Sequence, residues 1–140
     1  FCGTIGEKMV NLQSLYLSNN RIGDKGIEEL ATTFSEKLLN LRVLDLGNNR
    51  IGDKGIKKLA TACEKLDLLQ FLQLNNNKIT DEGMLELAKA VNQAVGKGKL
   101  QSLKSITLRD NKTNNMTDFG PHFQWSLNSK PTMVQRIAIR

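Results

Sequence analysis

The sequence contains one histidine, two cysteines and two prolines, and aromatic residues make up only 5% of it. Cys2 and Cys63 lack any metal-ligand spacing, and His122 alone cannot complete a zinc site with them. We therefore expect no metal and no cofactor. We interpret both cysteines as free thiols in a reducing, cytoplasmic compartment.

Long apolar runs are also missing. No stretch approaches the roughly 18 apolar residues that a membrane span requires. The start of the chain has no charged segment followed by an apolar one, so we expect neither a signal peptide nor a membrane partner. Because the sequence opens on Phe1 rather than methionine, we interpret it as a piece of a longer protein.

Signatures of catalysis are absent as well: there is no phosphate-binding loop, no nucleophile elbow and no zinc-protease motif. His122 could act as a base with Asp118, but a repeated pattern already explains that aspartate. Asn75, Asn77 and Asp81 do not have the alternating carboxylates and closing glutamate of a calcium loop. We expect a protein that is not an enzyme, with no catalytic and no metal-binding residues.

The net charge of +6 is unevenly placed. Residues 1–98 hold 13 basic and 12 acidic side chains, whereas residues 99–140 hold 7 and 2. The basic end has no dense Lys/Arg run and no interleaved aromatic residues, so we expect no nucleic-acid partner. Arg109, Arg136 and Arg140 could instead form a patch for an acidic protein, since guanidinium groups pair with carboxylates. A solvated edge without a partner is the alternative.

The main feature of the chain is an internal repeat. Three near-copies begin at Leu12, Leu41 and Leu69, with starts 29 and then 28 residues apart: LQSLYLSNNRIGDKGIEELA, LRVLDLGNNRIGDKGIKKLA and LQFLQLNNNKITDEGMLELA. A fourth copy starts at Leu103, and a degenerate capping strand is visible near Val134. We therefore assign residues 1–140 to one repeat domain.

Each repeat carries two successive hydrophobic periods. Leu15 and Leu17 alternate as in a short strand, and Asn20 follows where the chain turns away, so its amide can bond backbone groups and form a ladder with its equivalents. Asp24 then precedes a helical pattern and is predicted to cap it. That helical pattern consists of Ile27, Leu30, Ala31 and Phe34.

Two further positions fit a stack of such units. Gly26, Gly55 and Gly83 leave room where each helix start presses on the neighbouring coil. Cys63 lies among small apolar residues, where packing rather than reactivity explains it. Stacked strand–helix units bury a continuous core between a parallel strand layer and a helix layer, so we predict an α/β solenoid.

The motif L-x-x-L-x-L-x-x-N-x-I-x-D-x-G-x-x-x-L-A resembles the ribonuclease-inhibitor type of leucine-rich repeat over about residues 10–140. The resemblance implies a curved solenoid of about four to five repeats, with short parallel β-strands on the concave side and α-helices on the convex side. Related proteins include nuclease inhibitors, innate immune receptors, GTPase activators, actin-filament capping proteins and bacterial effectors. The resemblance therefore implies binding of a protein but not which one.

The last units depart from the motif. Asn111 and Met116 are separated by three extra residues, and Pro121 falls in the helix start. Terminal repeats must close the core against water, so we interpret residues 112–140 as a C-terminal cap. The segment Thr4 to Val10 resembles the end of a preceding helix, which predicts further repeats upstream. The bulky side chains of the cap are Phe119, Phe123, Trp125 and Leu127.

The strand residues between the inward leucines should form the binding surface for a protein partner. Aromatic residues within a polar rim are typical of binding hot spots, although single exposed apolar residues are also ordinary on any surface. We predict a monomeric interaction module or scaffold. The predicted partner-binding residues are Tyr16, Val43, Asp45, Phe71, Gln73, Asn75, Thr107 and Arg109.

Two alternatives stay open. A GTPase activator or other regulator would present a polar residue from a loop that follows a strand, such as Arg21, Arg50 or Asn76. The helix side could also carry contacts through its lysines, which we interpret as groups that favour solubility. These lysines are Lys25, Lys54, Lys57 and Lys58.

Overall fold

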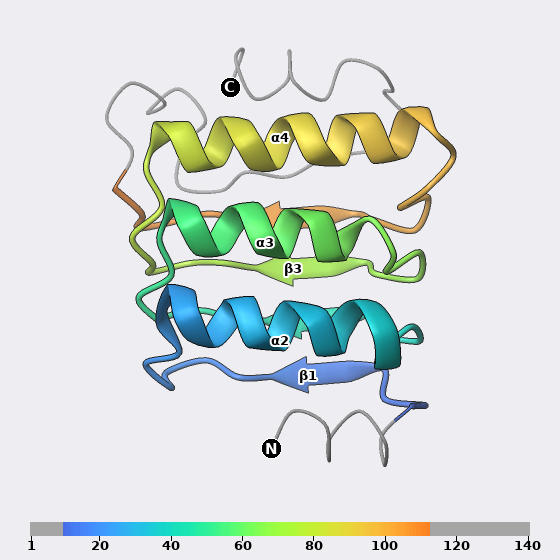
Figure 1. The fold of residues 1–140 in the computed structure, drawn as a ribbon, viewed down its shortest axis with the longest axis horizontal. Coiled ribbons are helices and arrows are strands. Elements are labelled where there is room, and N and C mark those ends of the chain that lie inside the picture. The colour runs from blue at the N-terminus through green and yellow to red at the C-terminus, as the bar shows by residue number, and fades with distance from the viewer. Residues whose placement is uncertain (1–9, 113–140) are drawn as a thin grey trace.

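The computed structural model describes residues 10–112, in which short strands and helices alternate. Figure 1 shows the helices side by side in one layer, with the strands in a second layer behind them. The predicted α/β leucine-rich repeat architecture is therefore confirmed. The elements are β1 (Ser14–Tyr16), α2 (Gly23–Lys37), β2 (Val43–Asp45), α3 (Asp53–Cys63), β3 (Phe71–Gln73), α4 (Asp81–Gly96) and β4 (Ser105–Thr107).

The strands form one parallel sheet in the order β1-β2-β3-β4. The central residue of each strand pairs with the central residue of the next: Leu15 with Leu44, Leu44 with Leu72, and Leu72 with Ile106. These central side chains point toward the helices, and the two residues that flank each of them point to the opposite face. The fold thus separates a core face from an outer strand face.

The hydrophobic core lies between the sheet and the helix layer. Leu44, Leu46, Ile56 and Leu59 have no exposed surface, and neither has Phe34, the largest of the fully buried side chains. The helices contribute residues at spacings of three and four, as the sequence pattern predicts. Each helix packs on the next, so the core runs unbroken through the described repeats.

The predicted asparagine ladder is confirmed. The Oδ1 atom of Asn49 accepts hydrogen bonds from the backbone N–H groups of Asn20 (2.9 Å) and Ile22 (3.3 Å). Its Nδ2 atom donates to the carbonyl of Leu17 at 2.8 Å. Asn77 forms the equivalent bonds to the repeat that contains Asn49. Each buried amide therefore satisfies backbone groups of two repeats, which fixes their register.

The prediction that Asp24 caps its own helix is wrong. Helix α2 begins at Gly23, and its N-cap residue, Ile22, makes no side-chain capping bond. The Oδ1 atom of Asp24 instead accepts hydrogen bonds from the backbone N–H groups of Gly52 (2.6 Å) and Gly55 (3.0 Å) in the next repeat. Because Gly55 is the third residue of α3, Asp24 takes the bond that an N-cap side chain of α3 would normally make.

Asp53 has the same role one repeat further. Its carboxylate accepts a hydrogen bond from the backbone N–H of Thr80 at 2.8 Å and a second bond from the Thr80 hydroxyl. Thr80 is the N-cap residue of α4 and has no capping side-chain bond within its own helix. The repeated aspartates therefore link each repeat to the helix start of the following one.

Gly55 and Gly83 allow this close approach. A Cβ atom at Gly55 would lie 2.7 Å from the Oδ1 atom of Asp24, and one at Gly83 would collide with the Oδ1 atom of Asp53. The prediction that the repeat glycines make room for the neighbouring coil is therefore confirmed for Gly55 and Gly83, whereas a Cβ atom at Gly26 would meet Ile22 of its own repeat. The predicted C-terminal cap beyond Lys112 and the degenerate strand near Val134 lie outside the described residues.

Candidate functional site

The outer face of the sheet consists of rows of side chains at matching heights. One row joins Ser14, Val43, Phe71 and Ser105, and a second joins Tyr16, Asp45, Gln73 and Thr107. A third row follows the strand ends, where the Arg109 backbone N–H donates to the Asn75 side chain at 2.8 Å. The fold therefore brings all eight predicted partner-binding residues onto one surface, which we call the strand face.

The apolar part of the strand face has two centres. Tyr16 is 64% exposed and Phe71 is 37% exposed, and both belong to the large hydrophobic side chains that remain exposed in the described residues. Val43 is half-buried and pairs directly with Phe71 on the neighbouring strand. Tyr16 lies two strands away from Phe71, which corresponds to roughly 10 Å, and in the adjacent row. A partner must therefore span both rows to contact both rings.

The polar part of the strand face is partly fixed by the chain itself. The Oδ1 atom of Asp45 accepts a hydrogen bond from the Gly47 backbone N–H at 2.9 Å, so this carboxylate has one preset orientation. The Asn75 side chain is held by the bond from Arg109. Within residues 10–112 the buried hydroxyl of Thr107 has no hydrogen-bond partner. Asp45 and Thr107 belong to β2 and β4, whereas Asn75 and Arg109 follow the ends of β3 and β4.

The loops between strands and helices carry the residues considered for a regulator. Arg21 and Arg50 are exposed and share a left-handed backbone conformation, with φ of 52° and 61°. Asn76 is exposed too, and its φ of 57° lies between those of Arg21 and Arg50, but the aligned repeats place it at the position of Asn19 and Asn48. The residue of its repeat that follows the ladder asparagine is Lys78. Sequence reasoning missed this equivalence, although the aligned repeats contain it.

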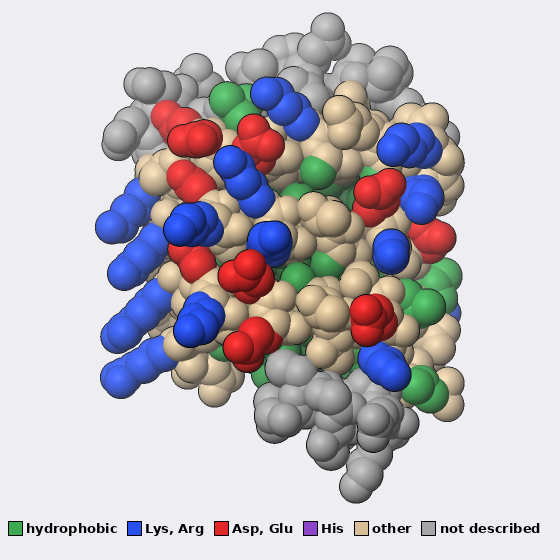
Figure 2. Space-filling view, in the orientation of Figure 1, with side chains coloured by type: hydrophobic (Ala, Val, Ile, Leu, Met, Phe, Trp, Pro, Cys, Tyr) green, Lys and Arg blue, Asp and Glu red, His purple; other side chains and the backbone are tan. Residues whose placement is uncertain are grey.

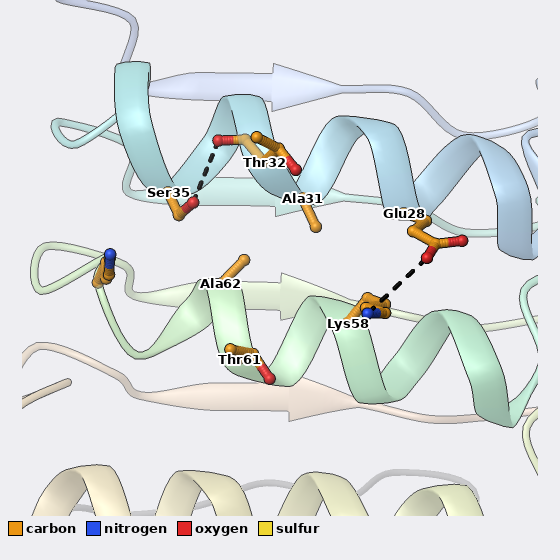
Figure 3. A pocket seen from close by; sticks show the side chains of 8 residues that line it. Glu28, Ala31, Thr32, Ser35, Lys58, Thr61 and Ala62 are labelled. Carbon is orange, nitrogen blue, oxygen red and sulfur yellow. Dashed lines mark hydrogen bonds and ion pairs between the residues drawn. The ribbon is translucent and has the colours of Figure 1, made fainter.

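The helix side offers an open groove between α2 and α3, of about 340 Å³ (Figure 3). Small residues such as Ala31 and Ala62 leave the space, and an ion pair of 3.8 Å between Lys58 Nζ and Glu28 Oε1 crosses one end. The Ser35 hydroxyl donates to its own helix, to the carbonyl of Thr32. The groove lining holds no nucleophile paired with a base, so it follows from helix packing and does not indicate a catalytic site.

The remaining chemical candidates give no further site. Burial raises the pKa of the Cys63 thiol from its ordinary value of 9.0 to about 12, so this cysteine is a core residue and a poor nucleophile. His122 and Asp118 lie outside the described residues, as do Cys2, Arg136 and Arg140. Residues 10–112 contain no cluster of metal-ligating side chains.

Among the helices of the described segment, none combines the length and the apolar character needed to cross a bilayer. The lysines predicted on the helix side are exposed there, and several surround a second hollow with Glu28 and Asp24 between them. Figure 2 shows basic and acidic side chains mixed over this face. This mixture is typical of a solvated surface.

Comparison with known proteins agrees with the geometry. Residues 10–61 match the family described as Leucine Rich repeats (2 copies), and residues 66–88 match the family described as Leucine Rich repeat. No curated protein matches the chain. Among solved structures, the chain is similar to "Leiomodin-1 Actin-Binding Site 2 (ABS2)", with a TM-score of 0.63 and 16% identity. The match covers 80% of this chain and 60% of that structure, and at this identity it shows the fold.

Proposed function

Because the chain belongs to the leucine-rich repeat proteins, we propose that it is a protein-binding module that holds its partner on the strand face. The observation that carries the proposal is the pair of exposed rings, Tyr16 and Phe71, within rows of polar side chains. Aromatic side chains bury a large area on binding and lose little rotamer freedom, which makes them effective anchors. No catalytic role is part of the proposal.

The rigidity of the support favours such a role. The strand residues are held from behind by leucines without exposed surface, such as Leu44 and Leu46, and by the asparagine ladder. A surface that is already ordered loses little conformational entropy when a partner binds. The flanking Asp45, Gln73 and Asn75 can form hydrogen bonds around the two aromatic anchors, as a polar rim does at interfaces.

Three finer properties belong to the same proposal. The repeats are of the ribonuclease-inhibitor type, supported by starts 29 and 28 residues apart and by helices of 15, 11 and 16 residues. The protein acts in the cytoplasm, supported by the free thiol of Cys63. It functions as a monomer that binds a different protein, as in the sequence-based expectation.

The test is an affinity capture from cell lysate with the full chain. A Tyr16→Ala, Phe71→Ala variant removes both anchors, and a Leu39→Ala, Leu85→Ala variant is the matched control because it removes two exposed apolar side chains elsewhere. Circular dichroism first confirms that both variants fold. A partner retained by the control and lost by the anchor variant supports the proposal, and a partner kept by both contradicts it.

Actin filaments are the first purified partner to test, since the similar solved structure is titled an actin-binding site. Co-sedimentation with filaments, using the same two variants, measures whether this chain shares that property. We expect any binding to weaken by roughly a hundredfold or more when both anchors are removed, because central aromatic hot spots contribute about 2 kcal/mol each and about 1.4 kcal/mol corresponds to a tenfold change in Kd.

A further inference from the structure

A basic residue follows the ladder asparagine in every described repeat. Figure 2 shows Lys and Arg side chains that project one above another along the left edge of the molecule, where the loops run from the strands to the helices (Figure 1). The residues at this position are exposed. We call this set, Arg21, Arg50, Lys78 and Lys112, the basic ladder.

Backbone hydrogen bonds hold neighbouring residues of the basic ladder, which we call its rungs, at matching positions along the edge. The Lys78 N–H donates to the carbonyl of Ile51 at 2.7 Å, and the Lys112 N–H donates to the carbonyl of Ile79 at 2.8 Å. Arg21 and Arg50 have nearly equal positive φ values, so the two side chains leave the backbone in similar directions. Neighbouring strands are about 4.8 Å apart, which sets the spacing of the rungs close to that value at their base.

Within residues 10–112 the four ladder residues take part in none of the ion pairs, and the exposed carboxylate nearest to them in sequence is Asp110, beside Lys112. The ion pairs of this segment lie on the helix side, between Lys58 and Glu28 and between Glu64 and two lysines. The nearby carboxylates of Asp24 and Asp53 are engaged by backbone groups of the next repeat. Four like charges at short spacing repel one another, so an anion that bridges them lowers the electrostatic energy of the edge.

We infer that the basic ladder binds an acidic peptide segment of a protein, in extended conformation, with carboxylates on alternate residues. Alternate side chains of an extended peptide recur about every 6.6 Å, a spacing that flexible Lys and Arg side chains can match from rungs about 4.8 Å apart. Arginine adds bidentate pairing with carboxylates. The ladder is a second surface, separate from the strand face.

An acidic peptide fits the edge better than a nucleic acid does. The exposed amides of Asn19, Asn48 and Asn76 lie in the same loops. Asn48 Nδ2 donates to Asn19 Oδ1, and the donors and acceptors that remain on these amides can bond a peptide backbone. Single-stranded nucleic acids bind through aromatic stacking, whereas the exposed rings of this segment, Tyr16 and Phe71, belong to the strand face.

The experiment measures fluorescence anisotropy of a labelled peptide of alternating glutamate and serine, about ten residues long so that it spans the rungs. The full chain is titrated at low and at physiological salt. The ladder variant is Arg21→Asn, Arg50→Asn, Lys78→Gln, Lys112→Gln, with asparagine where φ is positive because it tolerates that conformation. The matched control removes four exposed helix-side charges: Lys37→Gln, Lys57→Gln, Lys65→Gln, Lys89→Gln.

We expect the Kd for the glutamate peptide to rise about tenfold or more in the ladder variant and to change little in the control, because the pairs act locally and are screened over distance. An Arg21→Lys, Arg50→Lys variant should retain binding. A peptide with glutamine in place of glutamate should not bind. Removal of Tyr16 and Phe71 should leave this binding unchanged, which separates the ladder from the strand face.

Three results would overturn the inference. The first is absence of binding by the wild-type chain at low salt. The second is an equal loss in the ladder and control variants, which would indicate a general effect of net charge. The third is tighter, ladder-dependent binding of an oligothymidylate of about ten nucleotides, which would assign the edge to nucleic acid. Urea unfolding curves of each variant verify that the fold is intact.

Discussion

The first two described repeats have nearly the same sequence, but their equivalent side chains are buried to different extents. Leu44 and Leu46 of the second repeat have no exposed surface, whereas Leu15 and Leu17 of the first are only partly buried. Asn49 is fully buried, but Asn20 is exposed. The second repeat is stacked between two others that the structure describes. The contribution of a consensus residue to stability therefore depends on its neighbours in the stack as well as on its identity.

The largest expected difference concerns the strand leucines. Leu44→Ala should lower the free energy of unfolding by about 3–4 kcal/mol, because it leaves a cavity in a core that cannot collapse around it. Leu15→Ala should cost about half as much, since solvent already reaches part of this side chain. Urea unfolding followed by circular dichroism measures both values. Equal losses would show that burial in the stack does not control the contribution of these positions.

The next largest difference in lost stability is expected between the ladder asparagines Asn49 and Asn20. Asn49→Ala should cost about 2–3 kcal/mol, because it leaves the backbone N–H groups of Asn20 and Ile22 without their acceptor and removes one of the two donors to the Leu17 carbonyl. Asn20→Ala should cost less than about 1 kcal/mol, since its exposed amide bonds carbonyls that water can also reach. The same unfolding assay compares the two. A cost at Asn20 as large as at Asn49 would contradict the role that we assign to burial.

The sequence was sufficient for most of the fold because the signals are periodic. Alternating Leu15 and Leu17 predicted a strand, and the recurrence of Asn20 at the repeat length predicted a ladder. Periodicity also predicted which strand residues face outward. The aligned repeats also place Phe71 at the position of Ser14 and Tyr16 at the position of Gln73, so they predict different rows, and the register between the strands agrees.

The error at Asp24 has a physical reason. N-cap rules describe bonds within a few residues, and Asp24 directly precedes a helical pattern, so the local interpretation was natural. Its actual partners, Gly52 and Gly55, are 28 and 31 residues away and become neighbours only when the repeats stack. The basic ladder could have been found from the sequence, since Lys78 aligns with Arg21 and Arg50.

At Asp24 the first repeat should be as sensitive to substitution as an interior repeat, because this side chain bonds the start of α3 in the second repeat. Asp24→Ala removes the acceptor for two N–H groups at the start of α3 and should cost about 1–2 kcal/mol, more than Asn20→Ala. Asp24→Asn is the conservative control, since it keeps an acceptor oxygen and loses only the charge near the helix start. A loss at Asp24→Ala no larger than at Asn20→Ala would contradict capping between repeats.

The smallest expected effect depends on pH and compares equivalent helix positions. Cys63 of α3 occupies the position of Phe34 in α2 and Val91 in α4, and burial raises its pKa to about 12. The unfolded thiol ionises near pH 9, so the unfolded state binds fewer protons than the folded state above that pH, and stability falls as pH rises. Ionisation of the thiol in the unfolded state should lower the free energy of unfolding by about 1 kcal/mol at pH 10.

Cys63→Val removes this contribution, so the unfolding midpoint of the variant should fall less steeply than that of the wild type between pH 8 and about 10. Parallel curves for the two proteins would show that the Cys63 thiol does not ionise preferentially in the unfolded state.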